Sequence, residues 1–354
     1  MNNDVNEVLI VGPLPPPCGG ISTHIARLFD HLTNNGFICA LLNTSLLYNK
    51  MKIRFSALDW WDIFHKIVSF KGNIIHFHVS AMNNFYVFLL LFILISNEVK
   101  KIITIHSGDF INHYLKTNVI KRLAIKMILR KCEHIIIVNV EQMEFLREKI
   151  KISPNRMTVQ SAFLPPALGA EKVNEAIEAT IAKLRGKVKK IALVSGIPTE
   201  NYNFPFVLDI YRRLKQQNAD LGLIFAFYGL ADEEMFNCPV VQKATATEDV
   251  AVFNNLDQDR FIELLQSVDI YIRPTNYDGA SIAVREAIYL KKQIIASDSV
   301  ARPAGILIFK NRNAEDLQEK ILNAINDDRL GVSTYNLING GDTIINIYNN
   351  LLTQ

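Results

Sequence analysis

Two carboxylates, Asp278 and Glu286, stand eight positions apart in a stretch whose residue types suit contacts with hydroxyl groups and with an anion. The apolar run 268–272 predicts a buried strand, and Asp278-Gly279 predicts a turn after it. Ser281 can then cap a helix, whose first turn offers free N–H groups and partial positive charge to an anion. Two acidic groups beside an anion site fit a ligand whose hydroxyls they hold while cations hold its phosphate.

Candidate cations and a sheet edge lie close to this pair in the sequence. Arg273, Arg285 and Arg302 are the local candidates for contacts with phosphate. A second strand is predicted over 293–297, so a strand, a loop, a helix and a strand follow one another. A loop at the carboxyl end of a strand is where α/β sheets bind ligands. The pattern therefore predicts a binding site at this edge of a sheet.

This order of elements resembles the signature block of family-four retaining glycosyltransferases of the GT-B fold. The spacing from Asp278 to Glu286 is similar to the family's E-x7-E pattern, with Asp in place of the first Glu. The likeness extends over 269–298. It implies that the first carboxylate meets the donor sugar and that the second meets the ribose of the nucleotide. Taken alone, the two residues also have an ordinary interpretation, as a turn cap and a solvated helix residue.

Two stretches in the first half of the chain add to the resemblance. Residues 8–11 predict a buried strand, followed by a Pro-rich loop that ends in Gly19-Gly20 and by a helix. A glycine pair before a helix lets the backbone approach a phosphate or sugar, and this loop resembles the first loop of the family. His106 follows a strand predicted over 101–105. It resembles a His that lies near the donor sugar and the acceptor in the family.

The resemblance implies an α/β fold of the GT-B class, with two Rossmann-like domains facing each other across a cleft. The order of elements places an N-terminal domain at 1–163, a linker at 164–188 and a C-terminal domain at 189–339. The resemblance implies that the first domain binds the acceptor and the second the nucleotide-sugar. The C-terminal helix, within 340–354, is expected to pack back on the first domain.

The site residues that the resemblance implies form two groups. The catalytic group is His106, Asp278 and Arg273. Backbone N–H groups of 280–282 would face the diphosphate of the donor. The donor-binding group is Gly19, Gly20, Gly196, Arg273, Ala280, Ser281, Ile282, Glu286 and Arg302.

One position departs from the family. The family usually carries an Arg and, a few residues on, a Lys after the first strand of the C-terminal domain, and both stabilise the diphosphate. Here Gly196 is followed by residues 197–204, which include no cation. Either Arg273 and Arg302 supply the charge from other positions, or the chain is a weak nucleotide-sugar binder or an inactive relative.

The composition of the chain limits which partners and which cellular location are expected. Residues 1–160 carry a net charge of +7 and the remainder −4, which indicates different partners for the two halves. A basic helix expected over 115–132 can lie on an anionic membrane surface or be an ordinary surface helix. Scattered cysteines and an N-terminus without signal-peptide regions favour a cytoplasmic protein, with peripheral attachment to the inner face of the membrane left open. Basic residues lack interleaved aromatics, so no nucleic acid is expected.

No metal is expected. His76 and His78 alternate on a strand predicted over 74–79 and therefore point to one face, but no third ligand has matching spacing. Asp257-Gln258-Asp259 resembles a DxD metal motif, yet it precedes a predicted helix, where acidic residues suit the N-terminus.

The resemblance implies a retaining glycosyltransferase of the hexosyltransferase type that needs no cofactor. It would move a sugar from a UDP- or GDP-linked donor to a saccharide or lipid-linked saccharide, as in bacterial surface polysaccharide synthesis. The protein's main work would be to position the sugar and stabilise the departing diphosphate. A GT-B sugar-nucleotide epimerase and a non-catalytic partner subunit are the alternatives.

Overall fold

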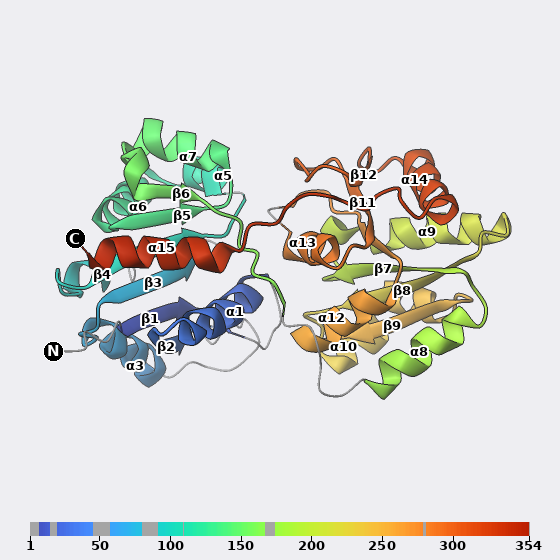
Figure 1. The fold of residues 1–354 in the computed structure, drawn as a ribbon, viewed down its shortest axis with the longest axis horizontal. Coiled ribbons are helices and arrows are strands. Elements are labelled where there is room, and N and C mark those ends of the chain that lie inside the picture. The colour runs from blue at the N-terminus through green and yellow to red at the C-terminus, as the bar shows by residue number, and fades with distance from the viewer. Residues whose placement is uncertain are drawn as a thin grey trace. The chain divides into compact units, whose positions relative to one another are not determined.

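The chain forms two compact units in the computed structural model. Unit 1 comprises residues 1–164 and 339–354, and unit 2 comprises residues 165–338. The structure describes residues 7–14, 20–44, 57–79, 91–108, 110–166, 174–278 and 281–353. Figure 1 shows the arrangement of strands and helices within each unit.

Unit 1 is built on a six-stranded parallel sheet in the order β2-β1-β3-β4-β5-β6. Its strands are β1 (Glu7–Gly12), β2 (Ile38–Asn43), β3 (Ile74–Val79), β4 (Lys100–Ile105), β5 (His134–Ile137) and β6 (Met157–Val159). Its helices are α1 (Gly20–Asn34), α3 (Ala57–Val68), α5 (Phe110–Lys116), α6 (Val119–Lys131), α7 (Val140–Phe145) and α15 (Gly340–Leu352), with short turns η1 (Leu146–Ile150) and η2 (Pro154–Arg156).

Alternating side chains of the unit 1 strands supply two apolar layers. On β1, Val8 and Ile10 pack with α1 and α15, while Leu9 and Val11 face the core that α3 and α6 cover. Such two-sided burial is expected of a parallel sheet with helices on both faces. Figure 1 shows α1 and α15 on one face of this sheet. The C-terminal helix therefore belongs to the first unit, although 174 residues of unit 2 precede it in the chain.

Unit 2 has a parallel sheet in the order β12-β11-β10-β7-β8-β9. Its strands are β7 (Lys190–Gly196), β8 (Leu221–Phe227), β9 (Val250–Asn254), β10 (Ile270–Arg273), β11 (Gln293–Ser297) and β12 (Leu307–Phe309). Its helices are α8 (Glu175–Arg185), α9 (Phe204–Gln216), α10 (Asp232–Asn237), α11 (Pro239–Thr245), α12 (Gln258–Ser267), α13 (Ile282–Tyr289) and α14 (Ala314–Asn326), with a short turn η3 (Glu200–Tyr202).

The strand order of unit 2 places a topological switch between β7 and β10. The first strand of the unit, β7, pairs with β8 on one side and with β10 on the other. The chain direction across the sheet reverses there, as in the doubly wound dinucleotide-binding fold. Ligands of such sheets bind outside the carboxyl ends of the strands at that point, so the ends of β7 and β10 are where a site is sought.

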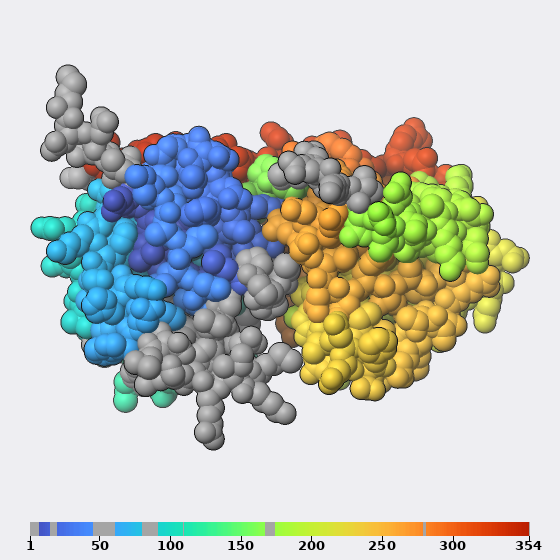
Figure 2. Space-filling view, turned by 90° about the horizontal axis from the view of Figure 1, so that it is seen from below, coloured from blue at the N-terminus to red at the C-terminus, as the bar shows by residue number. Residues whose placement is uncertain are grey.

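Two expectations about helices need correction. The basic helix expected over 115–132 is two helices, α5 and α6, because Asn118 caps the start of α6 by accepting a hydrogen bond from the backbone N–H of Lys121. The range 164–188, expected as a linker, belongs to unit 2 from Pro165 onwards, because its helix α8 buries Ile177 and Leu184 in a core of that unit. Figure 2 shows α8 at the surface of that unit, in light green. Among the described residues, no helix has the length and hydropathy needed to cross a membrane.

Candidate functional site

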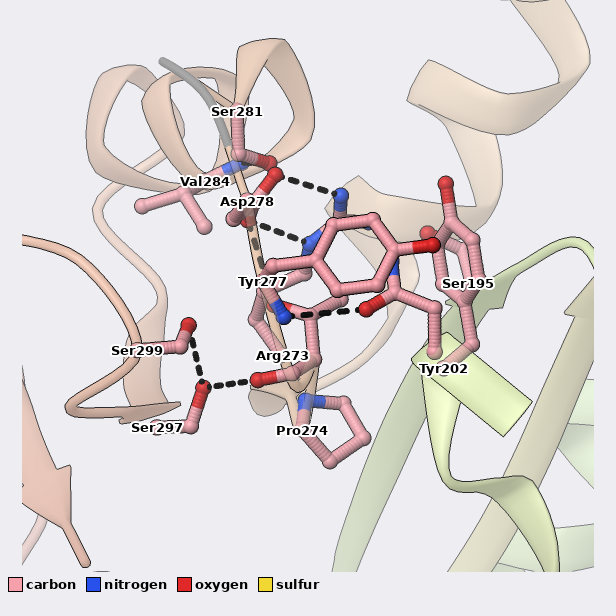
Figure 3. Close-up of polar contacts among 12 residues, drawn as sticks. Ser195, Tyr202, Arg273, Pro274, Tyr277, Asp278, Ser281, Val284, Ser297 and Ser299 are labelled. Atoms are coloured by element: carbon pink, nitrogen blue, oxygen red, sulfur yellow. Dashed lines mark hydrogen bonds and ion pairs between the residues drawn. The ribbon is translucent and has the colours of Figure 1, made fainter. Parts of the chain in front are cut away.

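The site in unit 2 is centred on an ion pair at the end of β10. Arg273, the last residue of that strand, donates from Nε to Oδ2 of Asp278 (2.9 Å) and from Nη2 to Oδ1 (3.1 Å). The two side chains are each 8% exposed. Figure 3 shows this bidentate contact between the strand end and the loop that leads to α13. Such fork geometry fixes the orientation of both groups.

A second guanidinium joins the pair. Arg302 donates from Nη1 to Oδ2 of Asp278 (3.0 Å) and from Nε to the carbonyl of Ser297 (3.2 Å). The Thr275 hydroxyl donates to the same Oδ2 (3.3 Å). We call Arg273, Asp278 and Arg302 the arginine–aspartate cluster. With two cations and one anion, it carries a net charge of +1 beside the first turn of α13.

The charge states of the cluster follow from its contacts. Burial alone would raise the pKa of Asp278, but Arg273 and Arg302 outweigh it and hold that pKa below its usual value. Burial would lower the pKa of Arg273, yet Asp278 raises it well above its usual value. Burial lowers the pKa of Arg302, and Asp278 opposes that shift. Asp278 is therefore an anion that orients two cations.

This geometry changes the interpretation of Asp278. Both of its carboxylate oxygens accept hydrogen bonds from the two arginines, so its described contacts hold the cations in place. The resemblance implies that Asp278 contacts the hydroxyls of a donor sugar, and it gives no indication that this carboxylate pairs with two arginines. A spacing of five residues between Arg273 and Asp278 was a signal for the pair, although the sequence did not reveal that both arginines share one carboxylate.

Gly196 packs against an aromatic ring. A Cβ added to Gly196, at the end of β7, would lie 2.0 Å from Cδ1 of Tyr202. The guanidinium carbon of Arg273 lies 4.9 Å from the centroid of that ring, a cation–π distance. Gly196 thus permits the close approach of Tyr202. The loop 197–204 has no cation of its own, and Arg273 of β10 supplies the one beside it. Tyr202 was not expected at this site.

Helix α13 begins as the sequence predicts. The Ser281 hydroxyl accepts a hydrogen bond from the backbone N–H of Val284 (3.4 Å), which makes Ser281 the N-cap, and Ile282 is the first residue of the helix. Ala280 lies outside the described residues. Glu286 lies in the second turn and is 3% exposed. It is a buried carboxylate, so the solvated-helix interpretation of Glu286 is wrong.

Two other candidates in unit 2 have ordinary roles. Arg285 is hydrogen bonded to Tyr335, and burial lowers its pKa. It is therefore not a member of the arginine–aspartate cluster. Asp257 caps α12 by accepting from the backbone N–H of Arg260 (2.9 Å), which accounts for the DxD-like stretch as a helix start.

The expected residues of unit 1 lie at the carboxyl ends of its strands. Gly20 is the first residue of α1 and is exposed, while Gly19 lies outside the described residues. His106 follows β4 directly, and its Nε2 lies 3.0 Å from Nδ1 of His78. His24 of α1 completes a group of three rings. The sequence paired His78 with His76, whereas the structure groups His78 with His24 and His106; His24 was not expected in this group.

Comparison with known proteins finds a family model that matches part of unit 2. Residues 177–336 match the family model of glycosyl transferases group 1. The matched residues all lie within unit 2, and the match confirms the resemblance found in the sequence for that part of the chain. A stretch of 75 residues is 35% identical to the N,N'-diacetylbacillosaminyl-diphospho-undecaprenol alpha-1,3-N-acetylgalactosaminyltransferase of Campylobacter jejuni. That match covers 20% of this chain and only a fifth of the length of this curated relative.

Solved structures share the fold over the whole chain. A glycosyltransferase from Rickettsia africae has a TM-score of 0.69 at 15% identity, over 99% of this chain and 100% of that one. MnaA of S. aureus in complex with UDP has a TM-score of 0.67 at 12% identity, over 99% of this chain and 98% of that one. The expected α/β fold of the GT-B class is confirmed by these likenesses and by the two parallel sheets.

Proposed function

We propose that this protein is a retaining glycosyltransferase that moves a sugar from a nucleoside diphosphate donor to a saccharide carried on a lipid. The observation that carries the proposal is the buried, net-positive arginine–aspartate cluster at the topological switch of a glycosyl transferases group 1 domain. A buried cluster with net positive charge beside a helix N-terminus is suited to an anion such as a diphosphate.

The donor would be UDP- or GDP-linked and would lie at the carboxyl ends of β7 and β10. Its diphosphate would face Arg273 and Arg302 together with the backbone N–H groups at the start of α13. Glu286, one turn further along that helix, would accept hydrogen bonds from the ribose diol. Asp278 would act as a positioning residue, since it holds both arginines. The two arginines would then replace the Arg and Lys that the family carries after Gly196.

The reaction exchanges two bonds at the anomeric carbon. An acceptor hydroxyl forms the new glycosidic bond on the face from which the nucleoside diphosphate leaves, so the anomeric configuration is retained. The bond between that carbon and the β-phosphate oxygen breaks, and the hydroxyl proton passes to the departing phosphate. Cations fixed before the reaction stabilise the charge that develops on that phosphate without having to reorganise. The chain needs no cofactor for this chemistry.

A lipid-linked acceptor is supported by two observations. The C. jejuni relative is named for transfer to a saccharide on diphospho-undecaprenol. In unit 1, α6 buries Ala124, Ile125, Ile128 and Leu129 in the core. A second apolar stripe on the same helix is exposed and consists of Val119, Ile120, Leu123 and Met127.

The exposed stripe of α6 suits the surface of an anionic membrane. Basic side chains accompany it on the same helix, namely Lys121, Arg122, Lys126, Arg130 and Lys131. Apolar residues flanked by cations are typical of helices that lie in the lipid headgroup region. We infer that unit 1 attaches peripherally to the inner face of the cell membrane, where a lipid-linked acceptor of surface polysaccharide synthesis would be found.

A transfer assay tests the function. The protein is incubated with UDP- and GDP-sugars and with saccharides on undecaprenyl diphosphate, and products are identified by mass spectrometry and NMR. The proposal predicts an acceptor extended by one sugar with retained configuration, and a loss of transfer in Glu286→Gln. Conversion of the donor without acceptor would favour the epimerase. Nucleotide binding without any turnover would favour the non-catalytic subunit.

Vesicle flotation tests the membrane attachment. Wild-type protein should bind vesicles that contain phosphatidylglycerol more strongly than vesicles of phosphatidylcholine alone. The double variant I120E/L123E should lose this binding. The control is Phe236→Glu, because Phe236 is an apolar residue of unit 2 that is even more exposed than Ile120 and Leu123. Equal binding by the double variant and the control would refute the α6 surface.

A further inference from the structure

Three histidines of unit 1 converge at the carboxyl ends of its strands. His24 lies on α1, His78 near the end of β3 and His106 directly after β4. Each offers one ring nitrogen, and these nitrogens all lie within 4.8 Å of one another. The ring centroids are 5.2 Å, 5.0 Å and 5.3 Å apart. Three imidazoles that share a tetrahedral zinc ion, with Zn–N bonds of about 2.0–2.1 Å, likewise have centroids about 5 Å apart.

His24 presents a bare nitrogen to the group. Its Nδ1 lies 2.7 Å from the carbonyl oxygen of Ala162, and because a carbonyl only accepts, Nδ1 carries the proton. The Nε2 atom therefore carries a lone pair. That atom is buried and has no hydrogen-bond partner among the described residues, and His24 as a whole is 2% exposed. A histidine whose second nitrogen donates to a backbone carbonyl is the usual form of a metal ligand.

His78 and His106 approach each other closely. Nδ1 of His78 lies 3.0 Å from Nε2 of His106, near the separation of about 3.3 Å between two nitrogen ligands of one tetrahedral ion. Nε2 of His78 is also buried without a hydrogen-bond partner in the part of the chain that the structure describes. Unpaired polar atoms in a protein interior cost free energy and call for an explanation. A cation shared by the three rings would pair the Nε2 lone pair of His24.

A fourth histidine serves as an internal comparison. The ring of His76 lies 4.1 Å from that of His78, yet both its nitrogens are paired, with the hydroxyls of Tyr348 (2.6 Å) and Thr104 (2.7 Å). His76 therefore supports the group without offering a ligand atom. Burial lowers the pKa of His24 to about 4, and burial with neighbouring histidines lowers the pKa of His78 and of His106 well below the usual range. Neutral imidazoles are the form that binds metal.

The group lies at the topological switch of unit 1. In the order β2-β1-β3, the first strand pairs with β2 on one side and with β3 on the other, so ligands are expected at the ends of β1 and β3. Gly12 ends β1, and a Cβ there would lie 3.1 Å from Cβ of His78 and 2.4 Å from Cδ1 of Ile25. The absence of a side chain at Gly12 therefore lets His78 take its place beside α1.

We propose that His24, His78 and His106 bind one divalent transition-metal ion of the zinc class, with a fourth position open to water or an oxygen ligand. Imidazole ligands select Zn²⁺, Cu²⁺ or Ni²⁺ over Mg²⁺ and Ca²⁺. Three protein ligands with an open position are typical of zinc sites that act on a bound molecule. The site is formed by unit 1 alone and does not depend on the proposed transfer reaction.

Metal titration of the full chain tests this site. Tag-free protein is treated with a chelator, dialysed and titrated with Co²⁺ and then Zn²⁺, with visible absorption and elemental analysis as readouts. We expect one Co²⁺ per chain, with the strong d–d bands of a tetrahedral nitrogen site and no thiolate charge-transfer band. His106→Gln should bind at least about 100-fold more weakly, since it removes a direct ligand. His134→Gln and His65→Gln should bind like the wild type.

A stability measurement keeps the test decisive if a variant folds poorly. Zn²⁺ should raise the Tm of the wild-type chain and of His134→Gln but not of His106→Gln, because a ligand that binds only the folded state stabilises it. His106 is the half-buried member of the group, so it is the ligand least needed for packing. No bound metal in the wild type, an octahedral cobalt spectrum, or equal binding by His106→Gln and His134→Gln would each overturn the proposal.

Discussion

Asp278→Asn should destabilise unit 2 by about 3–5 kcal/mol, because it leaves two buried guanidiniums without a counter-charge. The side chains of Arg273, Asp278 and Arg302 are 3–8% exposed, so solvent screens them little. At an effective dielectric constant of about 20, each close arginine–aspartate contact contributes about 4 kcal/mol of attraction. The variant loses two such contacts while the repulsion between the arginines persists. The neutral amide introduced by Asp278→Asn does not carry the free-energy cost of burying a carboxylate, and this offsets part of the lost attraction.

A double-mutant cycle isolates the cluster from general packing. Arg302→Met leaves the bidentate, neutral pair of Arg273 and Asp278 intact, so it should cost less than Asp278→Asn. In the double variant D278N/R302M only Arg273 remains as an uncompensated cation, because the guanidinium of Arg302 has been removed. The double variant should therefore be at least about 2 kcal/mol more stable than the sum of the single effects predicts.

The assay must distinguish the two units. Both tryptophans, Trp60 and Trp61, lie on α3 of unit 1, so their fluorescence follows that unit only. Hydrogen exchange followed by mass spectrometry on peptides of β10 and α13 reports the stability of unit 2 directly. A loss below about 1 kcal/mol for Asp278→Asn, or strict additivity in the cycle, would refute a buried charge cluster at this position.

Two further predictions concern a glycine and a histidine. Gly196→Ala should lower the free energy of unfolding by about 1–3 kcal/mol and weaken nucleotide binding, because the added Cβ would collide with the ring of Tyr202. The control Gly186→Ala meets only ordinary contacts and should be nearly neutral. Urea unfolding measures the stability of both variants, and calorimetry measures their nucleotide binding. Burial lowers the pKa of His134 to about 4, and the positive charge of Arg156 adds a smaller shift in the same direction. The folded state therefore resists protonation of His134. The contribution of neutral His134 to the free energy of unfolding is present above pH about 6.5 and is lost as the pH falls towards 4. His134→Gln should therefore reduce the loss of stability over that pH range by up to about 3 kcal/mol. A variant with the same pH dependence as the wild type would contradict this.

Local patterns in the sequence predicted most of the framework. The apolar run before Arg273, the turn at Asp278 and the cap at Ser281 each rest on neighbouring residues, and the strand and helix lie where these patterns indicate. The break between α5 and α6 was also marked, by Asn118 as a cap, but the basic residues on both sides suggested one continuous helix.

Contacts between distant residues could not be predicted in the same way. The pairing of His24 with His78 and His106 depends on how α1 crosses the sheet, and spacing along the chain carries no trace of it. The position of Tyr202 over Gly196 likewise depends on a loop whose path follows from packing. A pattern can reveal which residues are able to do chemistry, while tertiary packing decides which of them meet.

The proposed transfer depends on the claim that unit 2 binds a nucleoside diphosphate at the ends of β7 and β10, which calorimetry can test. UDP and GDP are titrated into the wild type, Arg302→Met, Glu286→Gln and the control Arg329→Met, whose arginine is exposed and pairs with Asp327. We expect one of the two nucleotides to bind. Loss of the Arg302 charge should weaken this binding about 30- to 100-fold, equal to about 2–3 kcal/mol, and the control should bind like the wild type. No binding of either nucleotide, or equal affinity in Arg302→Met and the wild type, would contradict the claim.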